Sequence, residues 1–370
     1  MILKLRGDST EAQLARLTSE LAQAGLKVMR SSERRRPILA IAGTLEGELR
    51  ERVLALNFVE EAHAKRGEWL RADRAFMERP TVVNVSGIAF GGGSVAVIAG
   101  PCSVEGSDQV HESAQIVRRC GAHMLRGGAF KPRTSPYAFQ GLGREGLRLL
   151  KEAGEAEGLP IISEVMDAAQ VATFRDLDVD CLQIGARNMQ NFTLLKAAAT
   201  AGRPVLLKRG LAATVAEWLS AAEYLLAHGC DDVLLCERGI RTFETATRNT
   251  LDLSVLPLLE LWTHLPVVVD PSHATGIPAL IPPLSRAAVA AGAAGIAVEM
   301  HPRPEEARSD GAQALLPGEL AELVASSRAI AGATGARLAR PAPLPGLPSA
   351  PPLELVTKIA PPEPESAQPL

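Results

Sequence analysis

From residue 94 onward, short apolar runs alternate with longer stretches whose apolar residues recur at helical spacing. The runs are Val95–Ala99, His123–Leu125, Pro160–Ser163, Cys181–Ile184, Pro204–Leu207, Asp232–Leu235, Pro266–Val269 and Gly295–Val298. The helical stretches are Ala114–Cys120, Arg144–Glu157, Ala168–Asp176, Asn191–Ala201, Thr214–Gly229, Thr247–Leu261, Ser285–Ala291 and Gly318–Ala333. Eight strand–helix repeats within about 240 residues predict an α/β fold, the (β/α)8 TIM barrel. An open doubly wound sheet would need a glycine-rich nucleotide fingerprint, and none is evident.

Residues 1–67 carry a different pattern. Four short apolar runs, at 2–6, 27–32, 38–43 and 59–64, predict strands, and two helical patterns lie at Leu14–Leu21 and Leu45–Leu56. Thr10 and Gln13 have the spacing of a capping box before the first helix. The resulting order β-α-β-β-α-β is the ferredoxin-like arrangement of a small α+β domain.

Between and after these units, the composition changes. Residues 68–93 read as a connector with a short β-hairpin, and Gly91–Gly93 form its exit. The barrel then spans 94–338, and the Pro-rich residues 339–370 are predicted to be a disordered tail. The charged run Arg34–Arg36 is interpreted as a solvated turn.

Composition excludes several classes of protein. The 370 residues carry a formal net charge of -3, with 46% hydrophobic and only 4% aromatic residues, which is typical of an α/β core. No extended basic face indicates nucleic acid, and no apolar run is long enough to span a membrane. Because the N-terminus lacks a signal-peptide pattern and the five cysteines contain no CxxC pair, we expect a cytoplasmic enzyme with reduced thiols.

Barrel enzymes place their active sites where the strands end at the carboxyl side, and here every run ends in a charged or metal-capable group. One set is cationic and comprises Arg126, Lys131, Arg133, Arg187, Lys208 and Arg238. Cations that converge at one rim repel each other, so they indicate substrates with phosphate and carboxylate charge. The alternative is that each pairs with a local carboxylate such as Glu164 or Glu237.

The second set could bind a metal and comprises Cys102, His273, Glu299 and Asp310. The first three follow strands one, seven and eight, which are neighbours in a closed barrel. A thiolate, an imidazole and two carboxylates suit a divalent transition metal rather than Ca²⁺ or Mg²⁺. Taken singly, a cysteine or histidine at a strand end is more often structural.

The segment LRGGAFKPRTSPYAFQGLG at 125–143 joins the two ideas. It combines three cations with two stiffening prolines, Pro132 and Pro136, and with the hydroxyls of Thr134, Ser135 and Tyr137. A rigid loop rich in hydrogen-bond donors is suited to a phosphate-bearing substrate.

Seven motifs together resemble the 3-deoxy-D-arabino-heptulosonate-7-phosphate (DAHP) synthase family. They are AGPCSVE, the 125–143 segment, QIGARNMQNF, VLLKRG, LCERGIRTFE, VDPSHATG and the VEMH…SDG pair, within roughly residues 82–335. The resemblance is strongest to the branch shared with 3-deoxy-D-manno-octulosonate-8-phosphate (KDO8P) synthase. It implies condensation of phosphoenolpyruvate with erythrose 4-phosphate, the first step of the shikimate pathway.

The resemblance also implies roles for single residues. Arg187, Arg238 and the Ala186 backbone would hold the phosphoenolpyruvate phosphate, and Arg126, Lys131 and Lys208 its carboxylate. Glu164 would position a water, Lys131 could donate a proton, and Asp270 would bind sugar hydroxyls. Arg133, Thr134 and Ser135 would bind the phosphate of erythrose 4-phosphate. Cys102, His273, Glu299 and Asp310 would ligate one Mn²⁺, Fe²⁺, Co²⁺ or Zn²⁺, with no organic cofactor.

Lys131-Pro132-Arg133-Thr134-Ser135 favours the four-carbon sugar, because KDO8P synthases have a K-A-N-R-S-type loop there. The family further implies that the small N-terminal domain covers the barrel mouth and binds tyrosine or phenylalanine as a feedback inhibitor, near Ser31 and Ser32, in a homotetramer. Two alternatives stay open: KDO8P synthase, and a catalytically silent amino-acid sensor.

Overall fold

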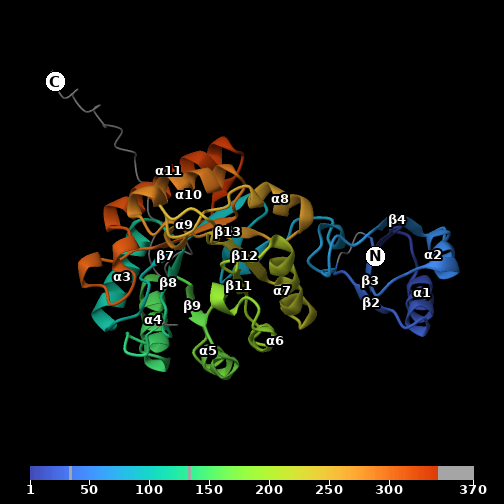
Figure 1. Cartoon of the computed structure of the whole chain (residues 1–370), viewed down its shortest axis with the longest axis horizontal. Coiled ribbons are helices and arrows are strands. Elements are labelled where there is room, and N and C mark those ends of the chain that lie inside the picture. Colours follow the sequence, from blue (N-terminus) through green and yellow to red (C-terminus); the bar gives the residue numbers. More distant parts are fainter. Residues whose placement is uncertain (33–35, 132–134, 341–370) are drawn as a thin grey trace, which may run out of the picture.

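The computed structural model describes residues 1–32, 36–131 and 135–340, and shows a barrel with a small N-terminal unit beside it (Figure 1). Predictions for Arg34, Arg35, Pro132, Arg133, Thr134 and the tail from 341 therefore lie outside the described residues. Within the part that is described, no helix is long and apolar enough to cross a membrane.

Eight parallel strands form the barrel, in the order β7 to β14, and β14 pairs with β7 to close it. This confirms the predicted (β/α)8 architecture. The strands are β7 (Ser94–Gly100), β8 (Met124–Arg126), β9 (Ile161–Val165), β10 (Cys181–Ile184), β11 (Val205–Lys208), β12 (Val233–Glu237), β13 (Val267–Val269) and β14 (Gly295–Glu299).

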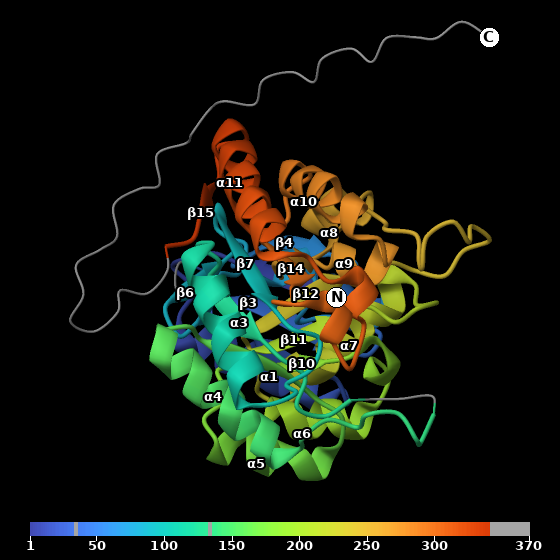
Figure 2. The same ribbon diagram turned by 90° about the vertical axis from the view of Figure 1, so that its left-hand side faces the viewer.

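Helices surround the barrel on its outside (Figure 2). The α-helices are α3 (Ser107–Arg119), α4 (Arg144–Glu157), α5 (Val171–Asp176), α6 (Phe192–Ala199), α7 (Val215–Ala227), α8 (Val255–Trp262), α9 (Pro271–Thr275), α10 (Ile281–Ala290) and α11 (Pro317–Ala333). Short 3₁₀ turns are η2 (Ala168–Gln170), η3 (Ala186–Asn188), η4 (Pro278–Leu280), η5 (Pro304–Glu306) and η6 (Gly311–Gln313).

Strand alternation decides which side chains face the barrel interior. In β7, Val95, Val97 and Ala99 pack in the cluster shared with the helices, whereas Ala96 and Ile98 pack in the inner cluster. The inner cluster also takes Met124, Ile162, Leu206, Leu234, Val268 and Ala297. The residue two positions beyond each of these six continues the same inward-facing row, and these residues are Arg126, Glu164, Lys208, Cys236, Asp270 and Glu299. Arg126, Glu164 and Lys208 line the cavity at the mouth, whereas the other three are fully buried.

A hairpin closes the opposite end of the barrel. Strands β5 (Val83–Val85) and β6 (Ile88–Phe90) pair antiparallel, and Val83, Val85, Ile88 and Phe90 pack into the inner cluster. Near the same end, the short β15 (Arg337–Leu338) pairs with β7. This hairpin leaves the mouth at the carboxyl ends of the strands uncovered.

The N-terminal unit has the predicted order: β1 (Ile2–Leu5), α1 (Glu11–Gln23), β2 (Lys27–Arg30), β3 (Ile38–Ala42), α2 (Gly47–Leu54) and β4 (Val59–His63). Its antiparallel sheet has the order β2-β3-β1-β4, which is the ferredoxin-like topology. Thr10 and Gln13 form the capping box, with Gln13 N–H donating to Thr10 Oγ1 at 3.2 Å.

The connector, with η1 (Arg74–Phe76), attaches this unit to the side of the barrel near α7 and α8 (Figure 1). Glu223 on α7 accepts from the backbone N–H groups of Arg71 and Ala72 at 3.0 and 2.9 Å. Trp69 stacks on Trp262 with ring centroids 6.1 Å apart. The unit is thus attached away from the mouth, and the expectation that it covers the mouth is not met in this structure.

The helix predicted at Thr247–Leu261 is wrong in its first half, because α8 begins at Val255. Residues 248–250 donate their backbone N–H groups to other segments of the chain: Arg248 donates to Thr275 O, Asn249 to Ala274 O and Thr250 to Ile240 O. These tertiary hydrogen bonds replace helical ones. They hold an extended loop against α9, at the rim of the mouth.

Candidate active site at the carboxyl ends of the barrel strands

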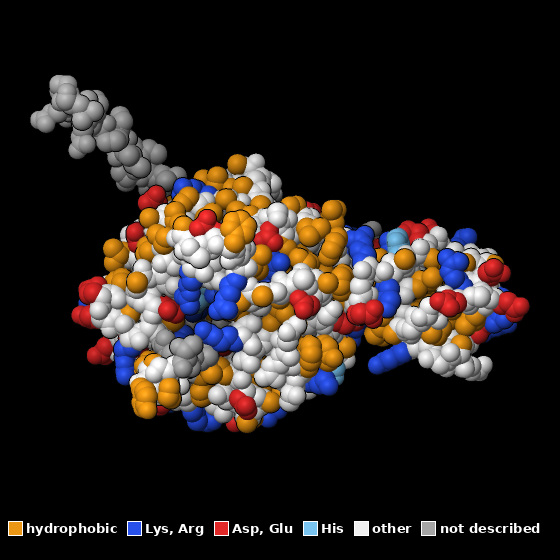
Figure 3. Space-filling model, in the orientation of Figure 1, with side chains coloured by type: hydrophobic (Ala, Val, Ile, Leu, Met, Phe, Trp, Pro, Cys, Tyr) orange, Lys and Arg blue, Asp and Glu red, His pale blue; other side chains and the backbone are white. Residues whose placement is uncertain are grey.

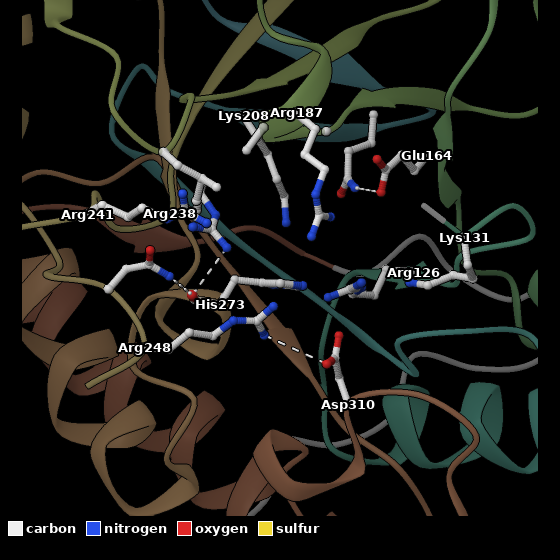
Figure 4. A pocket seen from close by; sticks show the side chains of 15 residues that line it. Arg126, Lys131, Glu164, Arg187, Lys208, Arg238, Arg241, Arg248, His273 and Asp310 are labelled. Atoms are coloured by element: carbon white, nitrogen blue, oxygen red, sulfur yellow. Dashed lines mark hydrogen bonds and ion pairs between the residues drawn. The ribbon is translucent and has the colours of Figure 1, made fainter. Parts of the chain in front are cut away.

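A cavity of about 340 Å³ opens at the carboxyl ends of the strands. Figure 3 shows Lys and Arg side chains gathered on this face of the barrel. Its described lining contains two carboxylates, Glu164 and Asp310, but seven cations: Arg126, Lys131, Arg187, Lys208, Arg238, Arg241 and Arg248. The ends of Arg126, Arg187, Lys208 and Arg238 converge on the centre of the cavity (Figure 4). Such an excess of positive charge is stable only with anions among it.

Two of these cations have buried carboxylate partners. Lys208 Nζ lies 2.5 Å from Asp270 Oδ2, and Arg126 Nη2 lies 3.1 Å from Glu299 Oε1. Arg126, Lys208, Asp270 and Glu299 are all buried. Despite burial, His273, Lys208 and Arg126 hold the pKa of Asp270 well below its usual range. Both carboxylates therefore remain charged at neutral pH.

Arg187 and Arg238 have no carboxylate within ion-pair distance among the described residues. Glu237, offered as a local partner by the sequence, instead pairs with Arg209 on the outward face at 2.8 Å. Burial lowers the pKa of Arg238, whose side chain donates only to backbone carbonyls, Gly239 O and His273 O at 3.3 Å. A buried, unpaired guanidinium of this kind suits a phosphate. The local-pairing alternative thus fails at these two positions.

His273 sits between two carboxylates. Its Nδ1 lies 2.7 Å from Asp270 Oδ2, and its Nε2 lies 3.2 Å from Glu299 Oε1. Asp270 also accepts from the His273 backbone N–H at 3.0 Å, as the N-cap of α9. A carboxylate on one ring nitrogen fixes the ring and leaves the other nitrogen facing outward, which is the usual support of a metal-binding histidine.

Three of the four predicted metal ligands come together, and His273 lies beside them, outside the group. Cys102, Glu299 and Asp310 each offer one ligand atom, and these atoms lie within 4.8 Å of one another. Cys102 Sγ donates to Asp310 Oδ2 at 3.3 Å, and Glu299 Oε1 has no hydrogen-bond partner among the described groups. Glu299 Oε1 lies within ion-pair distance of Arg126 Nη2 and His273 Nε2, so a nitrogen donor stands beside the sulfur and oxygen donors of the cluster. This donor set fits a divalent transition metal.

Lys131 links the metal cluster to the cationic cavity. Its Nζ donates to Cys102 O and to Cys102 Sγ, both at 2.9 Å, and the residue is buried. Burial, with Glu299 nearby, raises the pKa of the Cys102 thiol to about 12. A bound cation would be needed to favour the thiolate here.

Glu164 lines the cavity opposite this cluster. Gln183 Nε2 donates to its Oε2 at 3.4 Å. A Cβ at Gly185 would come within 2.0 Å of Glu164 Oε1, so the glycine makes room for the carboxylate. The backbone of Ala186 and the side chain of Arg187 follow at η3 and also line the cavity.

Two of the predicted substrate-binding residues, Asp270 and Ser135, do not line the cavity. Asp270, expected to bind sugar hydroxyls, is fully buried and does not line the cavity, because Lys208 and His273 occupy its oxygens. In this structure Asp270 thus contacts Lys208 and His273, and its contact with sugar hydroxyls stays a prediction. Ser135 is exposed on the loop after β8, where Tyr137 N–H donates to its Oγ at 3.3 Å. Pro132, Arg133 and Thr134 lie outside the described residues.

Sequence reasoning missed several residues at this site. Gln183, Arg241, Arg248 and Asn249 also line the cavity, and Gln313 donates to Glu299 Oε2 at 2.5 Å. Alternation along β10 would have placed Gln183 beside Glu164. Arg241, Arg248 and Asn249 lie in the loop after β12, and helical spacing from residue 247 onward made Arg248 and Asn249 look like the start of a helix.

Comparison with known proteins identifies the family of this chain. The DAHP synthetase I family matches residues 75–331. A phospho-2-dehydro-3-deoxyheptonate aldolase of Thermotoga maritima is 42% identical, over 91% of this chain and 100% of that protein. A 2-dehydro-3-deoxyphosphooctonate aldolase of Nitrobacter hamburgensis is 34% identical over 62% of this chain and 86% of its own length.

Solved structures give the same result. The crystal structure of the Thermotoga maritima phospho-2-dehydro-3-deoxyheptonate aldolase (DAHP synthase) superposes with a TM-score of 0.73 at 42% identity, covering 91% of this chain and 98% of that one. A truncated form of 3-deoxy-D-arabino-heptulosonate 7-phosphate synthase from Thermotoga maritima has a TM-score of 0.68 at 44% identity, covering 72% and 98%. On the match of 75–331 and this identity along most of its length, the chain belongs to the DAHP synthetase I family.

Proposed function

We propose that this chain condenses phosphoenolpyruvate with erythrose 4-phosphate and water to give DAHP and phosphate. The observation that carries the proposal is the cavity itself, in which seven cations face a cluster of Cys102, Glu299 and Asp310. Two phosphorylated substrates would supply the missing negative charge. The Thermotoga maritima phospho-2-dehydro-3-deoxyheptonate aldolase, which is 42% identical, supports the same activity.

Phosphoenolpyruvate would bind among the cations that line the cavity. Arg187 and Arg238 take its phosphate, and Arg126 and Lys208, already oriented by Glu299 and Asp270, take its carboxylate. Erythrose 4-phosphate would bind with its aldehyde toward Cys102 and its phosphate toward the loop after β8. Holding two anions that repel each other in a reactive pose is the main contribution of these cations.

The metal would be held by Cys102, His273, Glu299 and Asp310, where it would supply Lewis acidity toward the sugar aldehyde. Carbon 3 of phosphoenolpyruvate is the nucleophile, so no enzyme nucleophile is needed. Glu164 holds the water that adds to carbon 2, and Gln183 orients this carboxylate at 3.4 Å. Lys131 Nζ, between the two substrates, is placed to donate a proton to the aldehyde oxygen as it becomes a hydroxyl. Loss of phosphate from carbon 2 then leaves the keto acid.

The second candidate is KDO8P synthase, because curated relatives of 31–34% identity are named 2-dehydro-3-deoxyphosphooctonate aldolases. The segment Lys131–Ser135 reads KPRTS and favours erythrose 4-phosphate. The test compares phosphate release from phosphoenolpyruvate with erythrose 4-phosphate and with arabinose 5-phosphate. A higher kcat/KM with arabinose 5-phosphate would establish the KDO8P synthase alternative. Turnover of neither sugar would exclude both enzymes and support the catalytically silent amino-acid sensor.

Regulation is a separate part of the proposal. The ferredoxin-like unit would bind tyrosine or phenylalanine and inhibit the barrel in a homotetramer, in the cytoplasm. Five free thiols support a reducing compartment. Titration with each amino acid, on the full chain and on a chain beginning at Thr81, tests this. Equal inhibition of both chains would refute a regulatory role for residues 1–80.

A further inference from the structure

The loop after β12 reaches the candidate metal ligands through Arg248. Its Nη1 donates to Gln313 Oε1 at 2.7 Å and lies 3.8 Å from Asp310 Oδ1 (Figure 4). Gln313 in turn donates its Nε2 to Glu299 Oε2. The Arg248 guanidinium therefore contacts Asp310 directly and is linked to Glu299 through the Gln313 amide.

The direction of these hydrogen bonds matters. A glutamine amide could present either its oxygen or its nitrogen to Glu299, and the oxygen would repel the carboxylate. Arg248 can only donate, so it fixes Gln313 Oε1 on its own side and turns Nε2 toward Glu299. That arrangement occupies Oε2 of Glu299 and leaves Oε1 for an ion. In the described structure Oε1 makes no hydrogen bond and has ion-pair contacts with Arg126 and His273.

The backbone around Arg248 is fixed as well. Arg248 and Asn249 donate their N–H groups to Thr275 O and Ala274 O at 3.0 and 2.6 Å, and Asn249 Nδ2 donates to His273 O at 3.0 Å. Gly276 has φ +70, and a Cβ there would lie 3.2 Å from Arg248 Cβ. The glycine thus leaves space in which Arg248 crosses α9, the element that carries His273.

The segment that carries Asp310 and Gln313 is equally constrained. Asp310 has a left-handed backbone with φ 50, and a Cβ at Gly311 would come within 2.2 Å of Pro304 O. Leu315 N–H donates to Glu299 O at 2.9 Å, which ties this segment to the end of β14. Both ends of the Arg248–Gln313 link are therefore held in place.

We propose that Arg248 and Gln313 are positioning residues that orient Glu299 and Asp310 for the metal and thereby set its affinity. This rests on the proposed metal site of the proposed function and names residues that the site's ligand set does not include. Outer partners of metal ligands typically contribute about 10- to 100-fold in metal affinity.

The test measures Co²⁺ affinity of the full chain after removal of metal with a chelator, by competition with a chromophoric chelator and by the cobalt–thiolate absorbance. Arg248→Ala and Gln313→Ala should each weaken binding by about tenfold or more. Because they act through one link, the double variant should lose less than the product of the two. Thermal unfolding without metal checks that each variant is folded.

Arg241→Ala is the matched control. Arg241 is the same residue type in the same loop and the same cavity, yet no described contact joins it to the four ligands. It should bind Co²⁺ as the unaltered chain does. If Cys102→Ala abolishes binding while Arg248→Ala and Gln313→Ala do not weaken it, the positioning role is refuted and the metal site stands. If Cys102→Ala also binds normally, the metal site fails and this inference fails with it.

Discussion

At the scale of single residues, Asp270 shows how the barrel interior prepares the site. It is fully buried, yet it has three polar partners: Lys208 Nζ, His273 Nδ1 and the His273 backbone N–H. A buried charge is stable only when paired in this way. One carboxylate thus orients both a cation that lines the cavity and the imidazole that we propose as a metal ligand.

Asp270→Asn should therefore damage both functions. The amide keeps the shape but leaves Lys208 without a counter-ion, so we expect the free energy of unfolding to fall by about 3 kcal/mol. We expect kcat to fall about tenfold or more, because His273 loses the carboxylate that orients it. Urea unfolding and steady-state phosphate release measure the two effects.

Asp252→Asn is the comparison. Asp252 pairs with Arg209 at 3.0 Å on the outward side of the strands, away from the cavity. Its removal should leave kcat within about twofold of the unaltered chain. An undiminished kcat in Asp270→Asn would refute the role proposed for Asp270 in orienting Lys208 and His273.

At the scale of elements, the hairpin β5–β6 acts as a plug for the end of the barrel remote from the site. Phe90 is fully buried in the inner cluster and lies close to Gly295. Phe90→Ala should lower the free energy of unfolding by about 3–5 kcal/mol, because it leaves a cavity that the neighbouring side chains do not fill. Val82→Ala, at a position 49% exposed, should cost less than about 0.5 kcal/mol in the same urea titration. Equal losses in both variants would contradict the plug.

The β15 strand has a pH-sensitive attachment. His123 Nδ1 accepts from Val97 N–H at 2.8 Å, so its Nε2 donates to Ala339 O at 2.7 Å. This needs the neutral ring, and burial lowers the pKa of His123 to about 4. The unfolded chain takes up this proton near pH 6.5, so stability falls as the pH falls from about 6.5 to about 4.

His123→Gln should remove this part of the pH dependence, roughly 2–3 kcal/mol between pH 7 and pH 4. His228→Gln, which alters an exposed histidine, should retain it. Urea unfolding of the three chains at both pH values makes the comparison. An unchanged slope in His123→Gln would show that other groups account for the acid sensitivity.

Elements also show what the sequence could and could not predict. Eight apolar runs were enough for the barrel, and their endings were enough for Arg126, Glu164, Lys208 and Glu299, because alternation and closure are local rules. Arg248 was hidden, because its loop has helical spacing and is held by backbone bonds to Thr275 and Ala274 that no local pattern encodes. The full burial of Asp270 could not be predicted for the same reason, since burial depends on the whole barrel.

At the scale of the whole molecule, catalysis and proposed regulation are spatially separate. None of the described residues from 1 to 82 lines the cavity, and the connector is fixed to α7 by Glu223. Inhibition would therefore have to act through a change in how the small unit is placed, or through another subunit. The barrel, by contrast, carries the seven described cations of the cavity and the cluster of Cys102, Glu299 and Asp310.

The central claim is a metal-assisted condensation at this mouth, and the most direct test is phosphate release from phosphoenolpyruvate with erythrose 4-phosphate. Release should stop after chelation, return with a divalent transition metal, and be absent from Cys102→Ala together with its metal. Release that ignores the chelator, or that persists in Cys102→Ala with undiminished metal content, would contradict the claim.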